Sequence, residues 1–197
     1  VTDAPSKGNQ EGIFGYGNDS GYKSMTNLVS NAGVVATDTT GVGTARYGLA
    51  ATQYGGDKGI FGFGITASVT GVTNLVSNVG VVASDVTQVG TDREWAGGCS
   101  YGYDKGIFAF GTTGSLTAVS NLVSNAGVVA TDVTGVGTAR AYGPAACEYG
   151  GDKGIFGYGY TTGSVSMTNL VSNAGVVATD VTGVGTVRNS LAACSFN

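Results

Sequence analysis

The chain has 197 residues and a net charge of −4, with 9 Lys and Arg and no His. An acidic chain without a basic stripe is poorly suited to neutralising phosphates, which argues against nucleic-acid binding. The lack of His excludes Ser-His-Asp and Cys-His catalysis and His-ligated zinc or copper.

Small residues dominate the composition. Gly accounts for 36 residues, about 18 % against a typical ~7 %, whereas Pro occurs only 2 times. A hydrophobic content of 42 % is enough to build a core, so disorder is not expected. The sequence contains no run of about 18 apolar residues, so no membrane-spanning segment is expected. No signal peptide is recognisable, and because the chain begins at Val1 we expect a processed N-terminus or a longer parent chain.

One phrase recurs four times along the chain. Its Ile falls at positions 13, 60, 107 and 155, at spacings of 47, 47 and 48 residues, and an Arg follows at the same spacings. A period of this length is typical of solenoids, propellers and arrays. We therefore expect a single domain over residues 1–197. Its units are expected at 12–45, 46–92, 93–139 and 140–187, with 188–197 as a closing strand.

Each unit is predicted to hold four short antiparallel strands. In the second unit the predicted strands are residues 46–54, 58–64, 72–77 and 81–90. Gly55-Gly56-Asp57 and Asn78-Val79-Gly80 lie between strands and carry the residues that tight turns require. No segment has the 3.6-residue apolar period of a capped helix. Four strands per repeat is typical of a propeller blade, so we expect an all-β, four-bladed β-propeller rather than a β-solenoid.

The chain ends suggest how such a ring closes. The first unit begins directly at Gly12 and lacks the strand that residues 46–54 supply to the second unit. An equivalent segment appears at the C-terminus as Arg188–Cys194. We expect it to complete the first blade, which would remove the unpaired sheet edges that promote aggregation.

The order of two segments carries a family resemblance. Arg-Tyr-Gly-Leu-Ala-Ala at 46–51 is followed by a second motif, which stands at 150–159 as Gly-Gly-Asp-Lys-Gly-Ile-Phe-Gly-Tyr-Gly. This order resembles Kelch-type propeller repeats, although single glycines around Phe63 and Tyr158 replace the paired glycines and the late Trp is missing. The fuller phrase is similar to Kelch-like repeats in predicted virion and tail-fibre proteins of marine phages. The resemblance covers residues 12–197 and implies a propeller in a viral structural protein.

Residues that recur in every unit each allow a functional and a structural interpretation. Cys99, Cys147 and Cys194 share the repeat position of Thr52 and form either a thiolate metal cluster or a set of small packing side chains. Because no Cys-x-x-Cys pair exists and Thr52 is a poor ligand, we expect packing, no metal site and no cofactor. The recurring arginines are Arg46, Arg93, Arg140 and Arg188. They either form a ring that binds an anion, or each Arg pairs with a carboxylate or with strand-end carbonyls and so holds neighbouring blades together, an arrangement that we call a lock. We expect the locks. The recurring aromatics are expected in the core.

Positions where the copies disagree are better candidates for function. The candidate ligand or partner contacts are Asn18, Asp19, Tyr22, Lys23, Asp92, Glu94 and Trp95. Trp95 stands where the preceding unit has Gly48. An exposed Trp beside carboxylates can stack on a sugar or anchor a partner. Alternatively, Trp95 fills a gap left by a neighbouring Gly.

Three functions remain open. The favoured one is a non-enzymatic structural or adhesion module of a virion or another extracellular assembly, whose partners are neighbouring subunits or a host-surface receptor. The alternative is a carbohydrate-binding, lectin-like propeller that contacts glycans. An enzyme would need carboxylates such as Asp92 and Glu94 to act as a pair, and their spacing is thin support. We expect no nucleic-acid partner and no membrane insertion.

Overall fold

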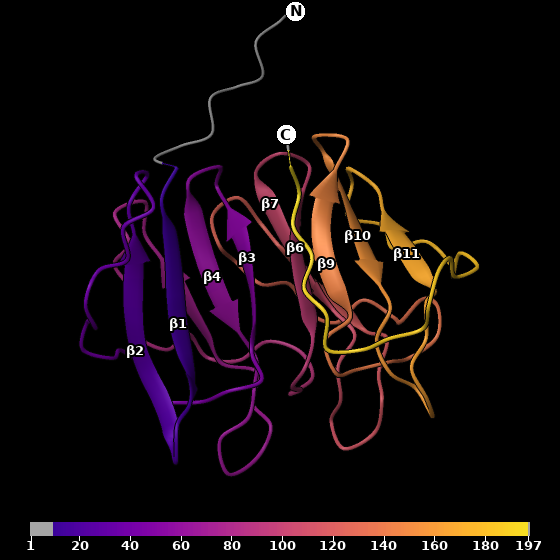
Figure 1. The fold of residues 1–197 in the computed structure, drawn as a ribbon, viewed down its shortest axis with the longest axis horizontal. Helices are drawn as coiled ribbons and strands as arrows, with labels where there is room; N and C mark the ends of the chain where they lie inside the picture. The colour runs from indigo at the N-terminus through magenta and orange to yellow at the C-terminus, as the bar shows by residue number, and fades with distance from the viewer. Residues whose placement is uncertain (1–9, 197) are drawn as a thin grey trace, which may run out of the picture.

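The structure is a computed structural model that describes residues 10–196, so the expectation about Val1 lies outside it. Within this range the chain forms eleven β-strands and no helix, and therefore none that could span a membrane. The strands make four small sheets that lie side by side (Figure 1). The predicted all-β class is confirmed.

The sheets follow the repeat units in order. The first sheet pairs β1 (Gly12–Asn18) with β2 (Tyr22–Val29). The second has the order β3 (Ala50–Tyr54), β4 (Lys58–Gly62), β5 (Thr73–Val76). The third has β6 (Gly97–Tyr101), β7 (Lys105–Ala109), β8 (Ser120–Val123). The fourth has β9 (Ala145–Tyr149), β10 (Lys153–Gly157), β11 (Thr168–Val171). All pairings are antiparallel.

The glycine-rich turns form where the sequence predicts them. Gly55 and Gly56, between β3 and β4, have φ angles of 63° and 80°. Two successive positive φ angles match the right-handed twist of a hairpin, and only Gly adopts both without strain. Consecutive sheets also approach closely at Gly62, where an added Cβ would lie 3.1 Å from Cζ of Phe108. This glycine leaves room for the aromatic ring of the next sheet.

The predicted fourth strand of each unit does not form as a regular strand. In the second unit the segment after β5 meets it only at isolated bridges, Val76 with Val82 and Thr73 with Val86. Between these bridges β5 advances three residues and the outer segment four, so the outer segment bulges. The Asn74 side chain causes the interruption, because it donates to the Ala83 carbonyl at 3.1 Å in place of a regular ladder bond.

The expected completion of the first blade is not seen among the described residues. The first sheet has two strands, and residues 191–196 belong to no strand. The C-terminal segment passes beside β9 (Figure 1), where Cys194 borders the same cavity as Cys147. Closure of a four-bladed ring therefore stays a prediction.

Aromatic side chains pack the sheets against one another. Phe61 meets Tyr16 of the preceding sheet with ring centroids 5.3 Å apart. Phe108 meets Phe63 at 5.3 Å, and Phe156 meets Phe110 at 5.5 Å. The core is therefore repeated between neighbouring sheets rather than gathered at one centre.

Candidate functional site

The recurring arginines lie between sheets. Arg46, Arg93 and Arg140 are each 0 % exposed. Arg46 donates to Asn74 Oδ1 at 2.7 Å and to the Phe63 carbonyl at 2.9 Å. Its guanidinium carbon lies 4.4 Å from the ring centroid of Tyr16 on the preceding sheet. The structure therefore supports the interpretation of these three arginines as locks.

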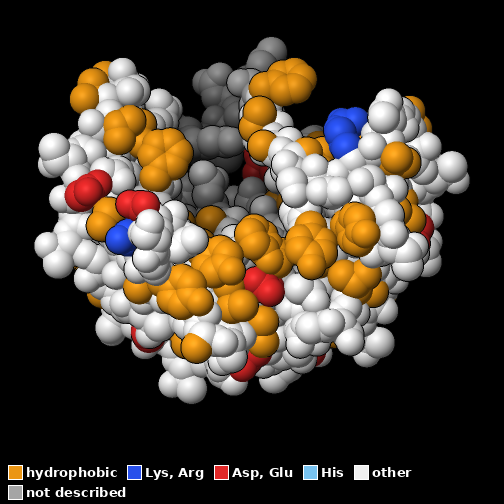
Figure 2. All heavy atoms as spheres, turned by 60° about the horizontal axis from the view of Figure 1, so that its bottom comes forward, with side chains coloured by type: hydrophobic (Ala, Val, Ile, Leu, Met, Phe, Trp, Pro, Cys, Tyr) orange, Lys and Arg blue, Asp and Glu red, His pale blue; other side chains and the backbone are white. Residues whose placement is uncertain are grey.

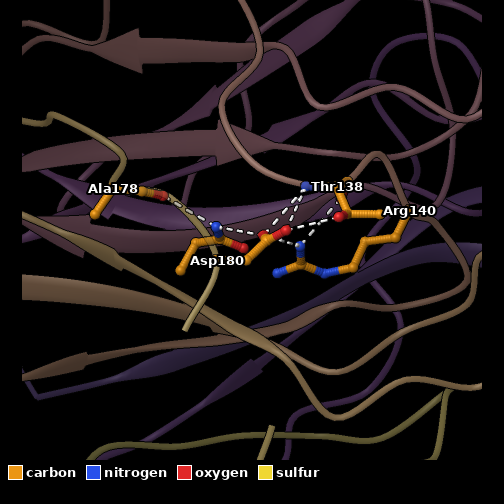
Figure 3. Close-up of polar contacts among 5 residues, drawn as sticks. Thr138, Arg140, Ala178 and Asp180 are labelled. Carbon is orange, nitrogen blue, oxygen red and sulfur yellow. Dashed lines mark hydrogen bonds and ion pairs between the residues drawn. The ribbon is translucent and has the colours of Figure 1, made fainter. Parts of the chain in front are cut away.

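An aspartate of the same unit as the Arg completes each lock, and it binds a Thr of the preceding unit. Asp85 accepts hydrogen bonds from Asn74 Nδ2 at 2.9 Å and from Thr44 Oγ1 at 2.6 Å, across 41 residues of sequence. The same arrangement joins Thr91 to Asp132, and Thr138 to Asp180. Figure 3 shows the last of these locks, in which Arg140 Nη1 lies 3.9 Å from Asp180 Oδ1.

The locks shift the pKa values of their members. Burial lowers the pKa of Arg93 and of Arg140 to about 10, against the opposing effect of Asp132 and Asp180. Burial alone would raise the pKa of Asp85, but hydrogen bonds from Thr44 and Asn74 outweigh it and hold this pKa below its usual value. Both groups stay charged near neutral pH, so the arginines serve structure rather than an exposed anion site.

A continuous row of aromatic side chains crosses all four sheets at one end. Neighbouring ring centroids are separated by 5.5, 5.9, 6.3 and 5.7 Å along the series Tyr22, Tyr47, Trp95, Tyr142 and Tyr160. We name these five residues the aromatic row. Tyr22 is 44 % exposed and Tyr142 is 45 % exposed, and the other three rings are half-buried. Figure 2, which brings the bottom of Figure 1 forward, shows hydrophobic side chains in an arc on this face.

Two members of the row have a costly backbone conformation. Trp95 and Tyr142 have φ angles of 55° and 54°. The equivalent residue of the preceding unit is Gly48, with φ 64°, and that of the C-terminal segment is Ser190, with φ 53°. The turn thus requires a left-handed residue, which Gly provides freely and a bulky side chain only at a cost of about 1 kcal/mol or more. Their aromatic rings are not needed for the turn itself.

The structure brings the divergent residues predicted from sequence to the end of the molecule that carries the row. Tyr22 stacks on Tyr47 with an interplanar angle of 22°. Asn18 ends β1 and Asp19 lies in the adjoining β1–β2 turn, and Asn18 Oδ1 accepts from the Gly21 amide at 3.2 Å. Lys23 follows on β2 and is half-buried.

The remaining candidates surround Trp95. Glu94 hydrogen-bonds the Trp95 side chain, and burial raises the pKa of Glu94. Asp92 is half-buried, and its Oδ1 has no partner among the described residues. Atom Cε2 of Trp95 would lie 3.4 Å from a Cβ added to Gly48. Trp95 therefore both fills the space over this glycine and continues the aromatic row.

Three members of the aromatic row are not among the candidate residues predicted from the sequence. Tyr47, Tyr142 and Tyr160 are also positions where the copies disagree, since the next unit has Glu94 for Tyr47 and the previous unit has Thr112 for Tyr160. The divergence that identified Trp95 could have found them. Their proximity could not be seen, because Tyr47 and Trp95 occupy adjacent rather than equivalent repeat positions.

A central cavity of about 620 Å³ lies between the inner strands β3, β6 and β9. Thr52, Cys99, Cys147 and Cys194 line it, as do Gln53, Ser100 and Glu148 one position further along. Burial raises the pKa of the Cys99 thiol to about 12, so the thiolate is disfavoured. Within residues 10–196 no cluster of three or more acidic or Cys side chains is placed to hold a metal ion.

No family model and no curated protein matches the chain. The solved structure of YjhT is similar, with a TM-score of 0.55 at 13 % sequence identity. The similarity covers 76 % of this chain and 49 % of YjhT, so the chain spans about half the length of that protein. At this identity the likeness concerns the fold alone, which this chain shares with part of YjhT.

Proposed function

We propose that the chain is a non-enzymatic structural or adhesion module of a virion or another extracellular assembly. In this proposal its four sheets are the blades of a four-bladed β-propeller, and residues 188–196 supply the inner strand of the first blade. The observation that carries the functional proposal is the aromatic row across one face.

The row has the properties of a contact surface. Tyr and Trp are the side chains most enriched at the centres of protein interfaces, because they bury a large area and keep a polar tip. Here they extend over four sheets instead of lining a concave pocket. Rigid sheets behind the row hold the rings in place, which lowers the entropy lost on binding. A neighbouring subunit or a host-surface receptor with a matching apolar surface fits this arrangement.

A glycan ligand is the second candidate, favoured by the carboxylate beside the rings. Exposed faces of Tyr22 and Tyr142 can stack on the apolar faces of sugar rings, and Glu94 next to Trp95 can accept from sugar hydroxyls. Such a lectin-like surface would bind free oligosaccharides, whereas a protein-binding surface would not.

Substituting the row with the residues that the repeat itself uses tests the proposal. Trp95→Gly and Tyr142→Ser install the residues found at Gly48 and Ser190, so the turn keeps its conformation and the fold is retained. We expect the double variant to bind intact virions or host cells at least about tenfold more weakly in co-sedimentation. The control is Tyr103→Ser, at the opposite end of β6, because Tyr103 is 67 % exposed and also has a positive φ of 69°.

The same variants separate the two candidates. Binding that soluble oligosaccharides compete away, together with signals on a glycan array, would favour the lectin-like function. Unchanged binding by the double variant would contradict a role for the row in either function.

A further inference from the structure

The interface between consecutive sheets occurs three times in the described chain with the same parts. A Thr and an Arg from the junction between units meet an Asn and an Asp of the next sheet, and an aromatic ring packs beneath the Arg. In the first interface these are Thr44, Arg46, Asn74 and Asp85, with Tyr16 beneath the Arg. A backbone bond accompanies them, from the Gly17 amide to the Arg46 carbonyl at 3.0 Å.

The C-terminal end carries one half of a fourth such interface. The Gly159 amide donates to the Arg188 carbonyl at 3.2 Å, and the Arg188 guanidinium lies 4.1 Å from the Tyr158 ring centroid. Tyr158 Oη donates to the Val184 carbonyl at 3.1 Å, just as Tyr16 Oη donates to Val42 at 3.1 Å. Unlike the other three arginines, Arg188 is exposed. The junction is docked on the fourth sheet and presents its cation outward.

The first sheet carries the other half. Asn27 Nδ2 donates to Asp38 Oδ1 at 2.8 Å, as Asn74 does to Asp85 at 2.9 Å. Within residues 10–196, however, no Thr donates to Asp38. Phe14 is 63 % exposed, whereas the equivalent rings that face a preceding sheet are 6 %, 0 % and 0 % exposed at Phe61, Phe108 and Phe156.

The two halves are complementary in charge and in hydrogen-bonding groups. Arg188 is a cation with free donors beside the Tyr158 ring, and the first sheet offers the Asp38 carboxylate, the Asn27 amide and the bare Phe14 ring. Both ends also border the same cavity, through Gln10 to Ile13 on one side and Ala193 to Ser195 on the other. Two surfaces of one chain that face one cavity meet at a high effective concentration.

We propose that Thr186 and Arg188 lock onto Asp38 and Asn27 of the same molecule, as the fourth copy of the repeated interface. This proposal rests on the ring architecture proposed above and not on what the aromatic row binds. Thr186 would donate to Asp38 as Thr44 donates to Asp85, Arg188 would donate to Asn27 Oδ1, and Phe14 would become buried against Tyr158.

A double-mutant cycle tests the lock. The pair Thr186→Val and Asp38→Asn is compared with the pair Thr138→Val and Asp180→Asn, whose hydrogen bond of 2.6 Å is already present. All four changes keep side-chain shape, so each variant is expected to fold. In urea unfolding we expect both pairs to show coupling of about fivefold or more in the unfolding equilibrium constant.

The outcomes are distinct. Coupling in the Thr186–Asp38 pair that does not change with protein concentration supports the lock. Coupling only in the Thr138–Asp180 pair overturns it. Coupling that grows with protein concentration, with a dimer in sedimentation, assigns the surface to a second copy and overturns closure within one molecule. None of these results depends on virion, cell or glycan binding, so failure of the adhesion proposal would be recognised separately.

Discussion

At the scale of single residues, the locks explain why an acidic, His-free chain keeps three arginines buried. A buried cation is stable only when hydrogen bonds and nearby charges replace the lost water. Asn121 Oδ1 accepts from Arg93 Nη2 at 2.7 Å, and the Phe63 ring lies 3.9 Å from the guanidinium carbon. Since one Arg contacts two sheets, a single side chain fixes the position of both, although Nε of Arg93 and Nε and Nη2 of Arg140 have no hydrogen-bond partner among the described residues.

The lock aspartates are expected to make the stability of the protein depend on pH in acid. The pKa values of Asp85, Asp132 and Asp180 are held below their usual value in the folded state, because hydrogen bonds from Thr and Asn outweigh the effect of burial. Their stabilising contribution is therefore present above the unfolded-state pKa of about 3.9 and is lost as the pH falls through the lower folded-state values. We expect the free energy of unfolding in urea to be nearly constant from about pH 7 to 5 and to fall below about pH 4.

Two variants check this origin. Asp85→Asn should reduce the slope below about pH 4, since one of the shifted carboxyls is removed. Asp19→Asn, in the exposed β1–β2 turn, is the control, because it removes one negative charge without removing a lock. An equal effect of both variants would assign the acid sensitivity to overall charge instead of to the locks.

At the scale of strands, glycines set the distance between sheets. Gly106 on β7 faces β3 so closely that an added Cβ would lie 2.6 Å from Thr52 Cγ2 and 2.8 Å from the Gln53 carbonyl oxygen. Gly154 on β10 faces Cys99 Sγ at 2.7 Å in the same way. An inner strand of one unit thus packs directly on a glycine of the next.

Replacing Gly106 should therefore separate the sheets. Gly106→Ala would normally gain stability through lower unfolded-chain entropy, but the clash with β3 backbone should make it destabilising by about 2 kcal/mol. The control is Gly163→Ala, because no atom lies within 4 Å of the Cβ it would add. Thermal and urea unfolding measure both, and a tolerated Gly106→Ala would mean that β3 and β7 are less closely packed.

Much of the arrangement of strands and turns could be predicted from the sequence. Turn glycines and apolar runs placed two strands in the first unit and three in each of the other units correctly, because these signals act over a few residues. The fourth strand was wrong since the Asn74 side chain replaces a backbone partner, which an apolar pattern does not reveal. The role of the arginines followed from their recurrence, but the row from Tyr22 to Tyr160 depends on contacts between units and is invisible in one repeat.

At the scale of the whole molecule, each sheet is stabilised by its neighbours, so the two ends decide how the array behaves. Such arrays gain stability from interfaces between adjacent units and expose hydrophobic surface where the array stops. In the described residues the first sheet exposes the Phe14 ring, and the last sheet exposes the Arg188 guanidinium over the Tyr158 ring. Closure within one chain would turn both into a further internal interface.

Gly59 reports on this closure. It occupies in β4 the place of Gly106 in β7 and Gly154 in β10, yet its added Cβ would have only ordinary contacts, such as 3.6 Å to Val76 Cβ. The difference arises because the first sheet has no inner strand to pack there. In the proposed closed ring, Cys194 would take the place that Thr52 takes against Gly106.

Gly59→Ala should consequently behave like Gly106→Ala. If the ring closes, the variant should be destabilised by about 2 kcal/mol in urea unfolding, because its methyl group would meet the closing strand. If the array stays open, the same change should be neutral or stabilising by about 0.5 kcal/mol, since the site has room and the unfolded chain loses freedom. Deleting residues 191–197 provides the internal control, because it should abolish the cost of Gly59→Ala while leaving that of Gly106→Ala unchanged.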